Sequence, residues 1–152
     1  MRFAALLLLA GGCSSSSRTG ADLSGFDTAR ITANGVEIEV WLADTGAQQL
    51  QGLMFATEVQ LDPLPDGTPR GMLFRFASED FRSFFMKDTF VPLDLAYATA
   101  DGTIVEIHSL VPLDLTPVTS SEPVQFALEV PAGTLAAEGI GVGDVIVIPP
   151  GA

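Results

Sequence analysis

The chain has 152 residues, of which 47% are hydrophobic, and its formal net charge at pH 7 is −12. This composition excludes an intrinsically disordered chain, and the acidic charge argues against a nucleic-acid partner, because phosphate binding needs a basic surface. The acidity is typical either of a surface adapted to high salt or of ordinary solubility.

The N-terminus predicts export. Arg2 precedes the apolar run Phe3–Ala10, which is far shorter than the ~20 residues of a membrane-spanning helix. Cys13, the single cysteine, follows Ala10-Gly11-Gly12 and precedes a serine-rich segment, an arrangement that resembles a bacterial lipobox. The alternative is an ordinary secretory signal with a chance cysteine.

We therefore expect a signal peptide at residues 1–12, then a lipidated Cys13 with a flexible tether at residues 13–25. The protein would be a membrane-anchored lipoprotein of the bacterial cell envelope, on the periplasmic side or the cell surface. An acylated Cys13 leaves no thiol for a disulfide, so the fold must depend on its apolar core.

Residues 26–150 are predicted to form one β domain, because turn signals recur at short intervals between apolar segments. Asn34-Gly35 is a strong hairpin signal, and Thr45 is a helix cap. The expected elements are strands Ala29–Ala33 and Val36–Ala43, helix Gly46–Met54, a loop at 62–67, strands Gly71–Phe76 and Phe81–Lys87, a hairpin of Leu93–Thr99 and Thr103–Leu110, strand Val124–Val130, helix Ala132–Glu138, and strand Asp144–Ile148. These segments indicate a mainly β fold, a compact antiparallel β-sandwich or small barrel with two short helices.

Common active-site motifs are absent from the sequence. It holds no nucleophile-elbow, zinc-protease or phosphate-loop motif, and one histidine with one cysteine excludes a His/Cys metal site. Asp62, Asp66 and Asp101 have the oxygen chemistry of calcium ligands, but aspartates are also common in turns. We expect no metal and no cofactor.

Lys87 is the only lysine, and it lies among Phe84, Phe85, Met86 and Phe90. A cation in such an apolar run is expected at a strand end or in an ion pair. Asp88, Asp94 and Asp114 are the candidate partners. We predict a partly buried pair with an aspartate of a Pro-Leu-Asp segment, and the alternatives are anion binding and catalysis by a lysine of lowered pKa.

The pentapeptide Val-Pro-Leu-Asp-Leu occurs twice, at Val91–Leu95 and Val111–Leu115. Its aspartates, Asp94 and Asp114, are expected to accept backbone N–H groups, and a catalytic carboxylate pair is the alternative. Glu106 and His108 are expected on one face of a strand. The candidate polar site therefore consists of Lys87, Asp88, Asp94, Glu106, His108 and Asp114.

Several ordered motifs from Gln51 onward resemble the domain of unknown function 192 family. They are Gly52-Leu53-Met54-Phe55, Gly71-Met72-Leu73-Phe74, Phe84-Phe85-Met86-Lys87-Asp88-Thr89, both Val-Pro-Leu-Asp-Leu copies, Val105-Glu106-Ile107-His108, Leu128-Glu129-Val130-Pro131-Ala132-Gly133 and Gly141-Val142-Gly143-Asp144. Phe85 and Asp88 depart from the family pattern, which usually has tryptophan and asparagine at these positions. The resemblance implies a compact, mainly β domain of sandwich or jelly-roll type, often exported, and attaches no activity to it.

The sequence leaves three classes of function open. We expect a non-catalytic module that binds a small ligand or an envelope protein. The alternative is an envelope hydrolase that uses Lys87, Asp94 and His108, and a purely structural envelope protein is the third possibility. A pocket that contains all three side chains favours the enzyme, whereas separate, locally satisfied side chains favour the binding module.

Overall fold

The computed structural model describes residues 19–152. The predicted signal peptide and Cys13 lie outside these residues. Within them, no helix is long and apolar enough to cross a membrane. The described part of the chain holds nine strands and three short helices: β1 Thr28–Ala33, β2 Val36–Ala43, α1 Gly46–Gln51, α2 Glu58–Leu61, β3 Arg70–Asp80, β4 Ser83–Phe84, β5 Leu93–Ala98, β6 Ile104–Leu110, β7 Val118–Thr119, β8 Val124–Pro131, α3 Thr134–Ala137 and β9 Ile146–Val147.

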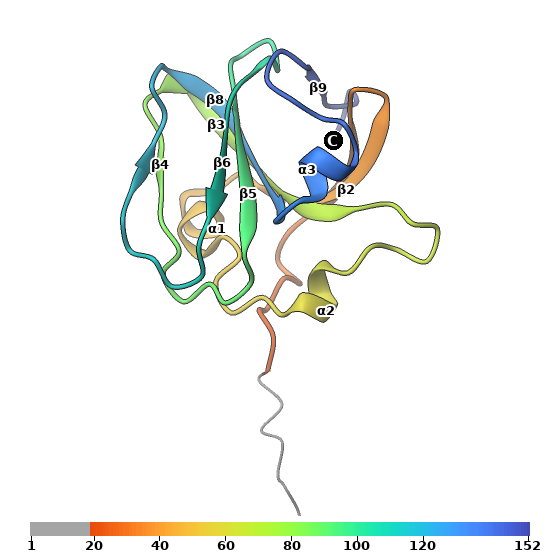
Figure 1. Ribbon diagram of the computed structural model, residues 1–152, viewed down its shortest axis with the longest axis vertical. Coiled ribbons are helices and arrows are strands. Elements are labelled where there is room, and N and C mark those ends of the chain that lie inside the picture. The colour runs from red at the N-terminus through yellow and green to blue at the C-terminus, as the bar shows by residue number, and fades with distance from the viewer. Residues whose placement is uncertain (1–18) are drawn as a thin grey trace, which may run out of the picture.

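Seven strands form one sheet in the order β6-β5-β8-β3-β2-β1-β9, and β4 pairs with β7 in a second, two-stranded sheet. Neighbouring strands are antiparallel except β2 and β3, which are parallel. The larger sheet curls, so that its strands cross at different angles in Figure 1. The prediction of a mainly β fold with short helices is confirmed, with one parallel pair in place of a wholly antiparallel arrangement.

The strongest local signals give the predicted elements. Asn34 and Gly35 both adopt positive φ, 49° and 76°, and they connect β1 to β2 with Ala33 opposite Val36. Both central residues of a type I′ turn need positive φ, which is why Asn-Gly favours this hairpin. The second predicted hairpin forms as β5 and β6.

Helix α1 begins at the predicted cap and ends early. The Thr45 side chain accepts a hydrogen bond from the Gln48 N–H, and the Gln48 side chain returns a bond to the cap backbone. Gly52, with φ 48°, ends the helix three residues before the predicted end at Met54. Leu50, within the helix, is 78% exposed, whereas Leu53, just after it, is buried.

Part of the segment predicted as a tether, residues 13–25, contacts the domain. Ala21 donates its N–H to Gln60 Oε1 and accepts from Gln60 Nε2 through its carbonyl, at 3.1 and 2.8 Å. Leu23 is 9% exposed and joins the core. These contacts fix the chain to α2 before the first strand begins.

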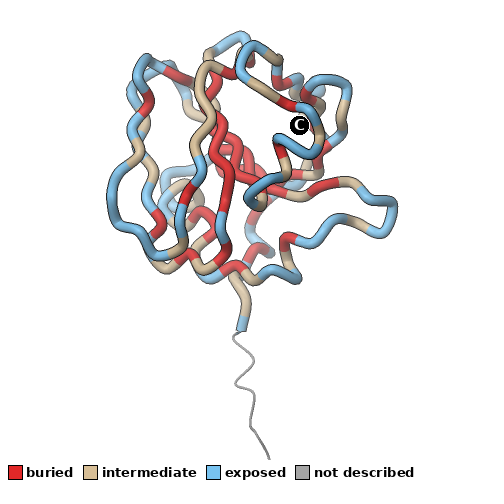
Figure 2. The backbone as a smooth tube through the Cα atoms, in the orientation of Figure 1, coloured by how far each residue is buried: buried red, intermediate tan, exposed pale blue. Residues whose placement is uncertain are grey.

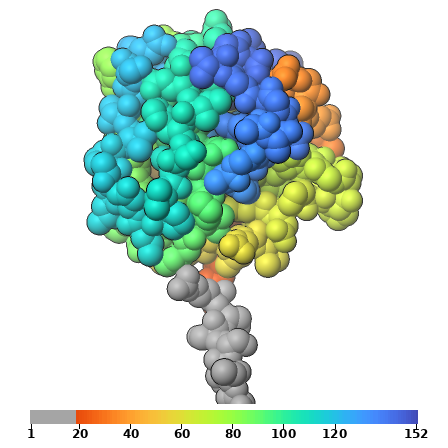
Figure 3. Space-filling model, viewed as in Figure 1, coloured from red at the N-terminus to blue at the C-terminus, as the bar shows by residue number. Residues whose placement is uncertain are grey.

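The seven-stranded sheet carries a separate hydrophobic core on each face. One core is aliphatic and includes Leu73, Leu128 and Val130 from the sheet with Leu135 of α3. The other includes Met72, Phe74 and Tyr97 from the sheet with Leu53, which follows α1. Figure 2 shows the buried segments concentrated in the central strands, and Figure 3 shows the C-terminal segments lying over one side of the domain.

Candidate functional site

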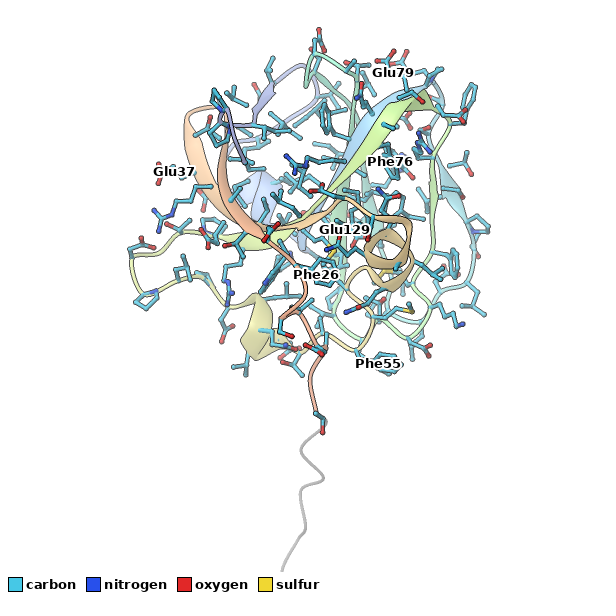
Figure 4. All side chains as sticks on the ribbon, turned by 180° about the vertical axis from the view of Figure 1, so that it is seen from behind. Phe26, Glu37, Phe55, Phe76, Glu79 and Glu129 are labelled. Atoms are coloured by element: carbon cyan, nitrogen blue, oxygen red, sulfur yellow. The ribbon has the colours of Figure 1, made fainter. Side chains whose placement is uncertain are left out.

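A pocket of about 420 Å³ lies on the aromatic face of the sheet, between α1 and the strands β3, β4 and β8. This volume falls within the range of small-molecule sites. Figure 4 shows the pocket side of the domain, with Glu129 beside the coil of α1 and Phe76 near it. The lining residues that matter below are Gln49, Phe74, Phe76, Phe81, Arg82, Phe84, Phe85, Lys87 and Glu129.

Five phenylalanines line the pocket. The Phe74 and Phe84 rings meet edge to face, with their centroids 4.7 Å apart. Phe84 also meets the buried Tyr97 ring at 5.8 Å. Phe81 and Phe85 are 56% and 49% exposed, so their rings stand at the mouth. The phenylalanine rings give the hollow an apolar wall beside its polar lining residues.

Glu129 supplies the one carboxyl group among the lining residues. Glu129 is opposite Met72 of β3 and Leu95 of β5 in the central part of the sheet. Residues opposite one another in a sheet point to the same face, so the Glu129 side chain lies on the aromatic side. The residue is 6% exposed.

The Glu129 carboxyl makes no hydrogen bond or ion pair with any residue from 19 to 152. Burial alone raises its pKa from 4.5 to about 8, because a charged carboxylate is poorly solvated there. Glu129 is therefore mostly protonated at pH 7. The carboxyl has no partner in the described residues and opens onto the pocket, an arrangement typical of a site that binds a ligand.

Polar side chains complete the rim. Gln49 of α1 donates from Nε2 to the carbonyls of Ala43 and Arg75, at 3.2 and 2.9 Å, which holds the helix against β3. The Arg82 guanidinium lies 4.0 Å from the centre of the Phe76 ring and donates to the Ser78 carbonyl at 2.7 Å. Its Nε atom is buried without a hydrogen-bond partner.

Lys87 also lines the pocket, but the predicted ion pair does not form. The lysine is exposed, and it pairs with no acidic side chain in the described residues. The prediction was wrong: Asp94 and Asp114, the aspartates of the two Pro-Leu-Asp segments, bond to backbone N–H groups instead. Asp88, with φ 51°, lies in the turn that follows the lysine.

The two Val-Pro-Leu-Asp-Leu copies fold differently. Asp94, 6% exposed, accepts from the Gly133 N–H at 2.8 Å and from the Ser109 hydroxyl at 3.4 Å. Asp114 is exposed and accepts from the Thr116 N–H at 2.8 Å, and this bond holds its pKa below the usual value. Both aspartates bond to backbone N–H groups as expected, and neither lines the pocket.

Glu106 and His108 contact each other on one face of β6. His108 Nε2 lies 2.9 Å from the Glu106 carboxylate, which also accepts from the Ser121 N–H and hydroxyl at 2.6 and 2.7 Å. Burial raises the pKa of Glu106, but the bonds from Ser121 and His108 outweigh this effect, and the net shift is downward. The predicted polar site is thus divided, and only Lys87 reaches the pocket.

The sequence analysis overlooked Glu129 as a site residue. Strand β8 is apolar on both faces, with Ala127 and Leu128 both buried. A strand packed on both sides cannot place a glutamate in bulk water. The position of Glu129 within this apolar segment was therefore the sequence signal for a buried carboxyl. Within residues 19–152, no three His, Cys, Asp or Glu side chains converge as a metal site.

Comparison with known proteins places these features in a family. The family model of DUF192, described as an uncharacterised ACR, matches residues 29–148. No curated protein matches the chain. A crystal structure of a candidate transcription regulator from Sinorhizobium meliloti is 32% identical with a TM-score of 0.71, and the alignment covers 81% of this chain and 95% of that one.

A second solved structure is similar over nearly its whole length. It is a protein of unknown function from Novosphingobium aromaticivorans, 30% identical, with a TM-score of 0.72. The alignment covers 90% of this chain and 99% of that one. The described domain therefore corresponds to nearly the whole of each solved relative.

Proposed function

This chain belongs to the domain of unknown function 192 family, and we propose that it is a binding module that takes a small amphipathic molecule into the Glu129 pocket without chemical change. The observation that carries this proposal is the Glu129 carboxyl, which faces a hollow of about 420 Å³. This carboxyl has no hydrogen-bond or ion-pair partner in the described residues. A ligand with an apolar body and one hydrogen-bonding head would fill the aromatic walls and satisfy the carboxyl.

The hydrolase alternative has weaker support. A nucleophile, a base and an orienting group must lie within hydrogen-bond reach of one substrate. Asp94 bonds to Gly133, His108 bonds to Glu106, and neither lines the pocket that contains Lys87. The separation of these side chains favours binding over catalysis.

A role in transcription, which the description of the Sinorhizobium relative names, has little support in this chain. The net charge of this chain is −12, and a DNA-binding surface needs lysines and arginines that neutralise phosphates. The described domain contains a single lysine. A small-molecule ligand fits the acidic surface better than nucleic acid does.

We further propose that the module works at the cell envelope, held to a membrane through lipid on Cys13. The support is the sequence alone: an apolar segment, small residues before the cysteine, and a serine-rich tether after it. Cys13→Ser should release the protein from the membrane fraction into the soluble fraction. Mass spectrometry that finds an unmodified Cys13 in the mature protein would exclude the anchor.

The binding function can be tested with 2-phenylethanol, an aromatic body with one uncharged hydroxyl. Titration followed by NMR should give saturable shifts at Gln49, Phe84 and Glu129. Phe81→Ala and Phe85→Ala, which remove the mouth of the pocket, should weaken binding. Phe55→Ala is the matched control, because Phe55 is similarly exposed, at 51%, but lies outside the lining and away from Glu129 in Figure 4.

The pocket proposal fails if the shifts do not saturate. It also fails if they gather near α2 and α3, where a second hollow of about 420 Å³ lies. Equal weakening in the Phe81, Phe85 and Phe55 variants would likewise contradict it, because the effect would then come from general loss of surface rings.

A further inference from the structure

Glu129 forms no ion pair in the described residues, although Arg82 and Lys87 line the same pocket. The neighbouring titratable groups are Tyr97 on β5, Glu106 on β6, Arg70 on β3, and Arg82 and Lys87 on the rim. Arg70 lies with its Cζ 4.4 Å from the centre of the Trp41 ring, and Arg82 is held on Phe76 and Ser78. Lys87 is exposed. Burial raises the pKa of Glu129, and no hydrogen bond or ion pair from the described residues offsets it.

The nearest ionisable neighbours provide no positive charge either. Burial raises the pKa of Tyr97, and the negative charges of Glu129 and Glu106 raise it further, so Tyr97 stays a neutral phenol. Its hydroxyl donates towards the Val118 carbonyl, 2.7 Å away, and is not available to Glu129. The pocket therefore contains an acid that is unpaired in the described residues and open to an incoming group.

The walls favour a positive charge as well. Phe74 and Phe84 line the pocket together with Glu129, and the faces of aromatic rings attract ammonium groups. The whole chain adds to this attraction, because a net charge of −12 raises the local concentration of cations at a concave site. The carboxylate, the rings and the overall charge favour a cationic ligand, whereas Arg82 and Lys87 of the same lining oppose one.

We infer that the ligand of this pocket is a monocation, an ammonium group on an apolar or aromatic body, whose head pairs with Glu129. This inference rests on the proposed binding function and identifies the class of its ligand. A single charge fits better than several, because the cations Arg82 and Lys87 line the same pocket and repel further positive groups.

Binding of such a ligand must expel a proton. The free pocket holds Glu129 as a neutral acid at pH 7, since its pKa is about 8. In the complex the carboxylate faces the ammonium, and the carboxyl proton leaves to solvent. Below pH 8 the affinity should therefore rise by almost tenfold for each unit of pH, because protons and ligand compete for the same carboxylate.

The test compares 2-phenylethylamine with 2-phenylethanol, which share a ring and spacer and differ in the charge of the head. Calorimetry from pH 6 to 8 measures affinity, and parallel titrations in buffers of different ionisation enthalpy measure proton release. We expect the amine to bind at least tenfold more tightly than the alcohol at pH 8, with nearly one proton released at pH 6.5. The affinity of the alcohol should not rise with pH.

Two charge-matched variants sharpen this comparison. Glu129→Gln should abolish the pH dependence and the preference for the amine while the alcohol still binds. Glu122→Gln removes the same charge from an exposed position outside the pocket and should leave both ligands unaffected. If Glu129→Gln folds poorly, the number of protons released when the amine binds the unaltered protein still tests the inference.

The outcomes separate the two proposals. Alcohol binding without preference for the amine, or amine binding without proton release, overturns the inference and leaves the binding function intact. Tighter binding of 3-phenylpropionate than of the amine overturns it too and assigns recognition to Lys87 and Arg82. If none of the three compounds binds, the proposed function fails together with the inference.

Discussion

The face of the sheet that carries Leu73, Leu128 and Val130 is filled with aliphatic side chains and closed by α3. The opposite face carries Phe74, Tyr97 and Glu129, is covered by α1 and the β4–β7 pair, and leaves a pocket. Adjacent residues of β8 serve both faces, because Leu128 and Glu129 point in opposite directions. One strand therefore contributes to a close-packed core on one side and to an unsatisfied polar site on the other.

This difference indicates where stability and function reside. Aliphatic packing lowers the free energy of the folded state, and nothing on that face needs a ligand. On the aromatic face, the buried Glu129 costs free energy whenever it ionises. A residue that destabilises the free protein is expected where binding later compensates for it.

The largest expected effect is on the pH dependence of unfolding. The folded pKa of Glu129, about 8, lies above its ordinary value of 4.5. The stabilisation that the protonated Glu129 gives the folded state is therefore fully present below pH 4.5 and is lost as the pH rises to 8. The total loss is on the order of 5 kcal/mol, at ~1.4 kcal/mol per pH unit. Chemical denaturation of Glu129→Gln should lack this decline and exceed the unaltered protein in stability at pH 9.

A pair of leucines contrasts the two faces directly. Leu128→Ala, in the aliphatic core at 0% exposure, should reduce the free energy of unfolding by about 2–5 kcal/mol. Leu50→Ala, at the pocket mouth with 78% exposure, should change it by less than about 0.5 kcal/mol. Equal losses in urea denaturation would show that the pocket side is packed as tightly as the core.

The repeated pentapeptide offers a smaller contrast. Asp94→Ala leaves the Gly133 N–H without its acceptor in a buried place, so a loss of about 1–3 kcal/mol is expected in the same assay. Asp114→Ala removes an exposed turn bond and should change stability little. Comparable losses would mean that both copies have the same structural role.

Lys87 should show the smallest effect. Because the lysine is exposed and unpaired within residues 19–152, an amine-reactive reagent should modify it almost as fast in the native as in the unfolded protein. Peptide mass spectrometry reports this site alone, and Lys87→Arg is the control for assignment. Strong protection of Lys87 from the reagent in the native state would contradict this expectation and support the ion pair that the sequence predicted.

Local signals were enough to predict much of the fold. Asn34-Gly35 predicted the first hairpin, the apolar segments Leu93–Thr99 and Thr103–Leu110 the second, and Thr45 the start of α1. The strand predicted at Phe81–Lys87 forms only over Ser83–Phe84, as β4, and its partner β7 was not predicted, because it exists only through pairing with β4. The parallel pairing of β2 with β3 likewise depends on contacts that no local pattern records.

The site was harder to predict than the fold. Lys87 attracted attention because it is unique, and it does line the pocket, but its expected partners already bond to nearby backbone groups. Glu129 stands between Leu128 and Val130, and its importance follows from the burial of both faces of β8. Spacing along the chain cannot show that α1, β3 and β4 surround one carboxyl.

The central claim is that Glu129 is a buried acid without a partner, poised in a ligand pocket. The most direct measurement is an NMR titration of its side-chain carboxyl carbon in the ligand-free protein, assigned by comparison with Glu129→Gln. The account predicts a midpoint near pH 8. A midpoint near the ordinary value of about 4.5 would show that Glu129 is solvated or already paired, and would contradict the account.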